Sequence, residues 1–346
     1  DTLKGGDGTD TAEFSGKMSD YRLDTDAGTV TDINTADGDD GTDTLDGIET
    51  VRFGDGELTL SSEAEELQVN TWEPSSQHDP SITSLADGNY VVTWQDDSGH
   101  DGGSGADIRG QVFTPSGAPL GEEFRVNTTT YQTQSDPSIA SLSVGGFVVT
   151  WESDYQDGDS SYYNIYGQRF DANGGSVGDE FMANVDRTIR DQHDPSVTGL
   201  DNGEFVITWS DESTSSRSSE LGSGFENREW AVFGQKFTMV SGTEDDTPVA
   251  NGDLFQANTY TSSTQYDATV TSLGSDGFVV TWAGNNQDGH EYGIFAQRYD
   301  TSGVPVGDEF QVSTETYQSQ QDPVSYTHLR AHETKANLVC RLLLEK

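Results

Sequence analysis

The chain has 346 residues, of which 61 are acidic and 17 are Lys or Arg, so its formal net charge is -44 at pH 7. A chain of this charge repels nucleic acid and anionic membranes and attracts divalent cations. No apolar run is long enough to span a bilayer. The one cysteine, Cys340, lies in an atypical C-terminal segment, so we expect no disulfide, thiol nucleophile or cysteine zinc site elsewhere.

Glycine turns with regularly placed aspartates open the chain. Residues 1–12 read DTLKGGDGTDTA and fit the nonapeptide G-G-x-G-x-D-x-U, preceded by the end of another copy. Glycine permits turns that bring carbonyls inward, and Ca²⁺ prefers six to eight hard oxygens. The segment resembles the calcium-binding RTX (hemolysin-type) repeats of proteins secreted by Gram-negative bacteria, which stack into a parallel β-roll. The resemblance implies that Asp1 and Asp10, with Gly6 and Gly8 in the carbonyl-donating turn, bind Ca²⁺.

The same resemblance implies an extracellular protein, exported by a type I secretion route. The residues that follow the turn look like the short β module that often accompanies RTX repeats, because Leu45, Ile48, Val51 and Phe53 alternate with polar residues. We therefore expect residues 1–60 to form an RTX calcium-binding turn and a short β module.

An acidic stretch within this module offers further oxygen ligands. Asp39 and Asp43 are candidate ligands of a second Ca²⁺, and the alternative is a solvated acidic loop. Residues 61–65 read as a linker.

One pattern is then repeated four times. Each copy begins with Gln-x-Asp, followed by Pro in three copies, and runs on to a tryptophan that ends an apolar stretch. The pairs are Gln77 and Trp94, Gln134 and Trp151, Gln192 and Trp209, and Gln265 and Trp282. A fifth copy begins at Gln320 and stops. Repetition of this kind indicates a repeat architecture.

Each copy contains four strand-like runs separated by turn residues. In the second copy the runs are 138–142, 147–151, 164–170 and 180–184. Four short antiparallel strands per unit are typical of a β-propeller blade. The rival is a series of closed two-sheet sandwiches, and one unit has too few apolar residues to bury its own core.

The expected fold class is therefore all-β. It is a partial, truncated β-propeller of four-stranded antiparallel blades, preceded by the end of an RTX β-roll and a small β module. We place this domain at 66–323, with complete blades at about 72–128, 129–185, 186–259 and 260–315, and with the start of a fifth blade. Residues 66–71 form an orphan strand that matches a fourth strand, which suggests ring closure by the N-terminal strand.

Two recurring features predict how the blades pack. The tryptophan that ends each second strand alternates with apolar neighbours, so it is assigned to the core. In the third strand a small residue precedes a glutamine in every copy. The four pairs are Gly110 and Gln111, Gly167 and Gln168, Gly234 and Gln235, and Ala296 and Gln297. A small residue at a fixed strand position predicts close approach of another backbone.

Antiparallel strand order places two kinds of link on one rim of the blades. The link from strand four to strand one carries Gln-x-Asp-Pro, and the link from strand two to strand three carries Asp-Gly loops. Asp101, Asp157 and Asp288 in those loops are further candidate Ca²⁺ ligands. The aspartates of Gln-x-Asp-Pro either bind calcium or another ligand at the rim or fix turns as scaffold. The nearby histidines, which are not repeated, are interpreted as surface residues.

The last 23 positions, 324–346, break the fifth repeat and are basic and helix-prone. They resemble the in-frame translation of a sequencing-library adapter, so we treat them as a non-native tail and expect the chain to be a fragment.

These features favour a secreted calcium-binding repeat protein that acts as an extracellular binding or adhesion module. The expected partners are Ca²⁺, the one cofactor, and an extracellular glycan or cell-surface ligand, without nucleic acid binding or membrane insertion. The blade plan is also similar to sialidase-type propeller repeats, although their Asp-box is absent. The alternative is therefore the propeller domain of an extracellular carbohydrate-active enzyme, sialidase-like or lyase-like. Common catalytic motifs are missing, so the sequence leaves enzyme activity open and favours a protein without it.

Overall fold

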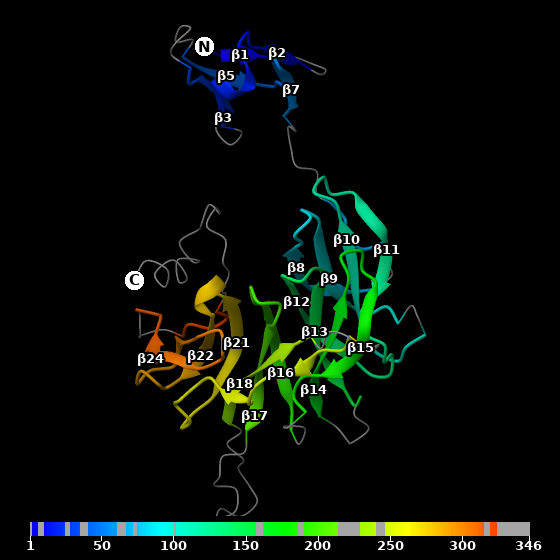
Figure 1. Ribbon diagram of the computed structural model, residues 1–346, viewed down its shortest axis with the longest axis vertical. Coiled ribbons are helices and arrows are strands. Elements are labelled where there is room, and N and C mark those ends of the chain that lie inside the picture. Colours follow the sequence, from blue (N-terminus) through cyan, green and yellow to red (C-terminus); the bar gives the residue numbers. More distant parts are fainter. Residues whose placement is uncertain are drawn as a thin grey trace, which may run out of the picture. The chain divides into compact units, whose positions relative to one another are not determined.

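The computed structural model (Figure 1) describes residues 2–5, 10–24, 28–34, 41–60, 67–71, 75–99, 102–156, 162–185, 190–213, 229–239, 246–314 and 319–323. The chain divides into two compact units, Asp1–Gln68 and Val69–Lys346. The tail 324–346 and the predicted ligands Asp1, Gly6, Gly8, Asp39, Asp101 and Asp157 lie outside the described residues. Among the described residues, no helix is long and apolar enough to cross a membrane.

The part of the first unit that the structure describes forms two small sheets. Its elements are β1 (Thr2–Lys4), β2 (Thr11–Glu13), η1 (Met18–Asp20), β3 (Tyr21–Asp24), β4 (Thr29–Asp32), β5 (Thr42–Asp46), β6 (Thr50–Phe53) and β7 (Gly56–Thr59). One sheet has the order β1-β5-β4-β3 and the other β2-β6-β7. Val30, Val51 and Phe53 form the buried core. Leu45 lies in β5 as predicted, whereas Ile48 falls between β5 and β6.

Two strand pairs of this unit are parallel. Strand β1 pairs with β5, so that Leu3 lies opposite Leu45, and β2 pairs with β6, so that Ala12 lies opposite Val51. The chain from β1 to β2 therefore runs beside the chain from β5 to β6 in the same direction. Parallel neighbours of this kind need a long connection between them, and both connections here include the β3–β4 hairpin.

The described residues of the second unit form four antiparallel sheets. They are β8 (Gln77–Ser84), β9 (Tyr90–Asp96), β10 (Asp107–Phe113) and β11 (Pro119–Arg125); β12 (Gln134–Ser141), β13 (Phe147–Asp154), β14 (Tyr163–Phe170) and β15 (Ser176–Met182); β16 (Gln192–Gly199), β17 (Phe205–Ser213), β18 (Glu229–Thr238), β19 (Val249–Ala250) and β20 (Phe255–Gln256); β21 (Gln265–Ser272), η2 (Gly274–Asp276), β22 (Phe278–Asn285), β23 (Tyr292–Tyr299) and β24 (Pro305–Gln311). Within each sheet the strands pair in sequence order, except that in the third sheet β19 and β20 both pair with β18 as two parts of the outer strand. The predicted all-β, propeller-like fold of four-stranded antiparallel blades is confirmed.

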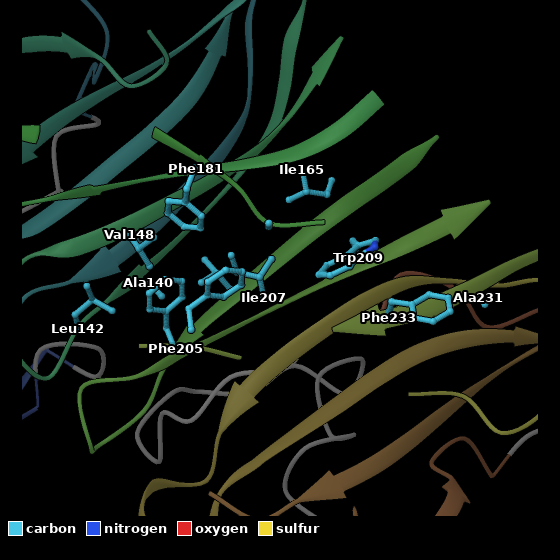
Figure 2. Close-up of a cluster of buried hydrophobic side chains, with 13 residues drawn as sticks. Ala140, Leu142, Val148, Ile165, Phe181, Phe205, Ile207, Trp209, Ala231 and Phe233 are labelled. Atoms are coloured by element: carbon cyan, nitrogen blue, oxygen red, sulfur yellow. The ribbon is translucent and has the colours of Figure 1, made fainter. Parts of the chain in front are cut away.

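Neighbouring blades share their hydrophobic cores. Val148 and Ile165 of the second blade pack with Ile207 and Trp209 of the third, and Figure 2 shows these side chains between the two sheets. Corresponding clusters join the first blade to the second and the third to the fourth. Trp151, Trp209 and Trp282 are fully buried, as predicted. The rival of separately closed sandwiches is therefore wrong, because each blade uses its neighbours to bury its faces.

The two signature motifs of the repeat face each other across strands one and two. In the second blade Ser135 pairs with Glu152 and Ser138 with Thr150, so Asp136 and Pro137 lie opposite the single residue Trp151. The same shift recurs in the other three blades. Two residues opposite one define a β-bulge. Gln-x-Asp-Pro thus lies inside the first strand, and its prediction as a link between blades was wrong.

The small residue of the third strand has a different neighbour from the one predicted. A Cβ atom added to Gly167 would come within 2.6 Å of the Phe181 ring, and the equivalent glycines face Phe124 and Phe255. The close approach is therefore to an aromatic ring of the fourth strand rather than to another backbone. The glutamine that follows has its own function, since Gln168 Nε2 donates to the carbonyls of Arg169 and Val177.

Contacts between blades also recur at the ends of the fourth strands. Thr128 donates its backbone N–H and its hydroxyl to Glu180 at 2.8 and 3.0 Å, and Thr259 does the same to Glu309. Thr71 makes the equivalent pair of bonds to Glu123. Residues 67–71 form no strand. Thr71 nevertheless has the contacts of a residue that follows the fourth strand of a preceding blade.

Candidate functional site

The most distinctive group of side chains in the second unit lies along the first strands of the blades. Strands β8, β12, β16 and β21 are neighbours in that order. The bulge aspartate of each strand adopts a left-handed backbone conformation, with φ between 50° and 56°, and the fifth copy repeats it with φ of 54°. We call these five residues the carboxyl row: Asp79, Asp136, Asp194, Asp267 and Asp322.

The bulges hold this conformation through bonds to the preceding blade. The backbone N–H of Asp194 donates to Glu152 Oε1 at 2.7 Å, and that of Asp267 donates to Ser210 Oγ at 3.1 Å. Aspartate is among the few residues that adopt the left-handed region readily. In the fourth copy, alanine follows Asp267 in place of proline. The proline of the motif is therefore not required for the left-handed backbone conformation of the aspartate.

The carboxyl row brings aspartate side chains of like charge close to one another. Burial, and then the nearby charges of Asp194 and Asp322, raise the pKa of Asp267 to about 7. Burial, followed by the charges of Glu152, Asp79 and Asp194, raises the pKa of Asp136 to about 6. Burial also raises the pKa of Asp194. Asp136 is more accessible to solvent than Asp194 and Asp267, so solvent screens its repulsion more strongly.

A buried glutamate links the second and third blades beside this row. Glu152 is 3% exposed, and its Oε2 lies 2.8 Å from His193 Nδ1. Burial lowers the pKa of His193, but the bond to Glu152 and the surrounding negative charge outweigh that effect, so the pKa is raised. His193, which the sequence analysis interprets as a surface residue, is thus partly exposed and bound to a buried glutamate. In the first blade His78 stays exposed between Asp79 and Asp97.

Aromatic side chains surround the same end of the blades. The ring of His193 lies 4.9 Å from Tyr163 and 5.4 Å from Trp230. In the fourth blade Tyr266 meets Tyr292 edge to face at 5.2 Å. Tyr163, Trp230 and Tyr292 stand at or next to the start of a third strand, at the end of the sheet that carries the bulges. This rim therefore combines aromatic rings with carboxyl groups.

The remaining described candidates lie apart from the row. Asp288 is in the loop between β22 and β23, where it accepts bonds from the His290 backbone and the Gln311 side chain. Asp43 lies in β5, opposite Val30, rather than in the acidic loop expected. Among the described residues, no group of three or more His, Cys, Asp or Glu side chains is arranged to hold a metal ion.

Asp10 of the first unit lies against the neighbouring parallel segment. Its backbone N–H donates to Glu49 Oε2 at 2.7 Å, and its carbonyl accepts from the Glu49 and Thr50 backbones. A Cβ atom on Gly5 would overlap the Gly47 carbonyl and come within 2.8 Å of Asp10 Oδ2. Hard oxygens from two stacked segments therefore converge beside Gly5.

Comparison with known proteins gives no family for the chain. No protein-family model matches it, and no curated protein matches it. Solved structures that are similar include a protein of unknown function from Dyadobacter fermentans (TM-score 0.46, 11% identity, 72% of each chain covered). Others are an alpha-L-arabinofuranosidase from Lactobacillus brevis (0.40, 12%, 73% of this chain and 78% of that chain) and an endo-arabinase from Bacteroides thetaiotaomicron (0.36, 12%, 86% and 94%). Similarities at this level do not identify an activity.

Proposed function

We propose that the chain is part of an extracellular, calcium-dependent binding protein. In this proposal the first unit binds Ca²⁺ and the blades present a rim that binds an extracellular glycan or another cell-surface ligand. The observation that carries the proposal is the parallel stacking of β1 and β2 on β5 and β6. A calcium site between glycine turns needs two such segments side by side, as the RTX-like motif at residues 5–12 implies.

The described residues around Asp10 fit a hard cation. The Asp10 carboxylate and the Gly47 carbonyl both lie beside Gly5, and the Glu49 carboxylate accepts from the Asp10 backbone N–H. Oxygen donors of this kind are what Ca²⁺ prefers, and a side chain larger than hydrogen at residue 5 would block their approach. Bound Ca²⁺ would neutralise clustered carboxylates and join the two segments, so folding of this unit would depend on it.

Substitution of Asp10 tests the calcium site. We expect Asp10→Asn to weaken Ca²⁺ binding by about tenfold or more, because affinity for Ca²⁺ depends on the number of charged ligands. The matched control is Asp308→Asn, which makes the same charge change at an exposed position of β24. Isothermal titration calorimetry of the full chain with CaCl₂, and thermal melting with EDTA and with excess CaCl₂, measure the effect.

Three results would contradict the calcium proposal. They are unchanged melting curves with EDTA and CaCl₂, the absence of saturable Ca²⁺ binding, and equal binding by Asp10→Asn, Asp308→Asn and the parent chain.

The rim of the second unit supports the binding part of the proposal. Tyr163, Trp230 and Tyr292 offer rings on which a sugar or an organic cation stacks, and carboxyl groups offer hydrogen-bond acceptors to hydroxyl groups. Binding on a glycan array without turnover is the expected behaviour, and loss of binding in Trp230→Ala would assign it to this rim.

A second candidate is a carbohydrate-active enzyme, and the placement of aspartates on neighbouring first strands in the carboxyl row favours it. Glycoside hydrolysis pairs a protonated carboxylic acid with an ionised carboxylate. Asp267, with its pKa near 7, has the protonation expected of the acid. Release of product from aryl glycosides, abolished by Asp267→Asn, would establish this function in place of binding alone.

A further inference from the structure

A cavity lies on the face of the first blade that points away from the second blade. Its volume is about 150 Å³. Its apolar lining includes Val69, Val92 and Trp94, and its polar lining includes Asn70 and Gln77. The opposite face of the blade is packed on the second blade, so the cavity marks the face that the second blade does not cover.

In the next three blades the corresponding place is filled by an aliphatic side chain. Val92 and Trp94 correspond to three pairs, which are Val149 and Trp151, Ile207 and Trp209, and Val280 and Trp282. Each pair lies in one buried cluster with an aliphatic residue from the third strand of the preceding blade, namely Ile108, Ile165 and Val232 in turn. Figure 2 shows Ile165 and Trp209 in the second of these clusters. The cluster of Val92 and Trp94 contains no third-strand residue of a preceding blade among the described residues.

The fourth-strand residue that flanks this side chain elsewhere is already in place. Between the first and second blades, Val126 from the end of a fourth strand lies in the cluster of Trp151. Val69 corresponds to Val126 in sequence and packs against the cluster of Trp94. The cavity therefore has the flank that a fourth strand provides, and the third strand beside it is the missing part.

The asparagine at the cavity indicates how a third strand would enter. Asn70 Nδ2 donates to Gln77 Oε1 at 3.2 Å, as the equivalent asparagine of the second blade does to Gln192 at 2.7 Å. In three blades the oxygen of this asparagine accepts the backbone N–H of the third-strand aliphatic residue, at 2.7, 2.9 and 2.8 Å: Ile108 to Asn127, Ile165 to Asn184 and Val232 to Asn258. An incoming segment that repeats this geometry would donate the same N–H to Asn70 Oδ1.

The burial of the third strands decides what can occupy the cavity. Each third strand carries Ile or Val two positions before the small residue that precedes its glutamine. These residues are 0%, 0%, 0% and 5% exposed in Ile108, Ile165, Val232 and Ile294. A folded second copy therefore presents none of them on its surface. The occupant is accordingly a segment of this sequence type that is not already part of a blade.

Charge favours such a segment. His78, which also lines the cavity, lies 2.6 Å from Asp79 and 3.2 Å from Asp97, in a chain of formal net charge -44. The third strand of the second blade, Tyr163–Phe170, contains Arg169 and no acidic residue. A segment of this composition is attracted to the acidic surface around the cavity.

We propose that this cavity docks an extended segment with the third-strand sequence of the repeat, supplied by another protein chain. Its Ile or Val side chain enters the cavity against Val92 and Trp94, and the backbone N–H of that residue donates to Asn70 Oδ1. Main-chain bonds then supply affinity and the side-chain pocket supplies specificity, as in other cases of strand addition. The proposal does not depend on calcium binding or on the aromatic rim, because it uses other residues.

A peptide tests the docking of this segment. The probe is a fluorescein-labelled peptide of residues 163–170, titrated with the full chain and followed by fluorescence anisotropy, and we expect saturable binding. The control peptide carries Ile165→Ser, which keeps the charge and removes the aliphatic side chain. We expect it to bind at least about tenfold more weakly, because burial of a branched aliphatic side chain is worth that factor or more.

Three variants of the chain locate the binding. Val92→Phe fills the cavity, and we expect it to weaken binding by about tenfold or more. Val306→Phe makes the same change at a residue of β24 that is 43% exposed, and we expect unchanged binding. Asn70→Ala removes the acceptor without filling the cavity, and we expect binding about fivefold weaker. Circular dichroism checks that each variant is folded, and Asn70→Ala keeps the test decisive if Val92→Phe is not.

Two kinds of result would overturn the proposal. The first is the absence of saturable binding, equal binding of the two peptides, or equal binding by Asn70→Ala and the parent chain. The second comes from sedimentation velocity of the parent chain and Val92→Phe. Association of two parent chains that Val92→Phe abolishes would assign the cavity to a second folded copy in place of an extended segment.

Discussion

Trp209→Ala is expected to destabilise the second unit by about 3 to 5 kcal/mol, the usual cost of removing a fully buried aromatic side chain. Trp209 has no exposed surface and lies in the cluster that joins the second and third blades. Its removal would leave a cavity between two sheets, and each sheet depends on the other for burial. Urea denaturation followed by circular dichroism measures the loss, which is a large share of the total stability of a domain.

The repeat supplies a matched control for this prediction. Ile139 and Ile82 occupy the same position of successive copies, but Ile139 is 7% exposed and Ile82 is 65% exposed. We expect Ile139→Ala to cost about 2 to 4 kcal/mol and Ile82→Ala less than about 0.5 kcal/mol. Equal losses of stability in Ile139→Ala and Ile82→Ala would contradict the difference in burial between the two side chains. Such a result would mean either that the blades do not pack on one another or that another surface buries Ile82 in solution.

The correct part of the sequence prediction came from the way in which successive side chains of a strand point to opposite faces of the sheet. Phe147, Val149 and Trp151 were placed on one face because a strand has a period of two, and all three pack toward the first blade. The opposite face, with Val148, packs toward the third. Patterns of this kind depend only on neighbours in sequence, so they predict strands and buried faces without knowledge of the partner.

Features that depend on two strands were not predictable in the same way. The position of Asp136 inside a strand follows from a bulge opposite Trp151, and only the register of the pair reveals it. Glu152 resembles a charged residue at a strand end, but the next blade buries it and supplies its partner His193. The one signal in the sequence was the joint recurrence of Gln-x-Asp and the tryptophan, which indicates that the two motifs are in contact.

A second large effect is expected at a buried amide. Asn184 is 1% exposed, and its Oδ1 accepts from the Ile165 backbone at 2.9 Å. Its Nδ2 donates to Asn164 Oδ1 at 2.8 Å and to Gln192 Oε1 at 2.7 Å. Asn184→Ala leaves these groups unsatisfied in the interior, so we expect a loss of roughly 2 to 3 kcal/mol in the free energy of unfolding.

The fourth blade indicates which replacement would restore part of this loss. There Ser313 occupies the equivalent place, and its Oγ accepts from the Ile294 backbone at 3.1 Å, as Asn184 Oδ1 does from Ile165. We therefore expect Asn184→Ser to recover about half of the stability lost in Asn184→Ala, because one of the three hydrogen bonds returns and a smaller void remains. Urea denaturation of both variants compares them. If serine and alanine were equally destabilising, the bond to the third strand would not be the reason why this position is polar in every blade.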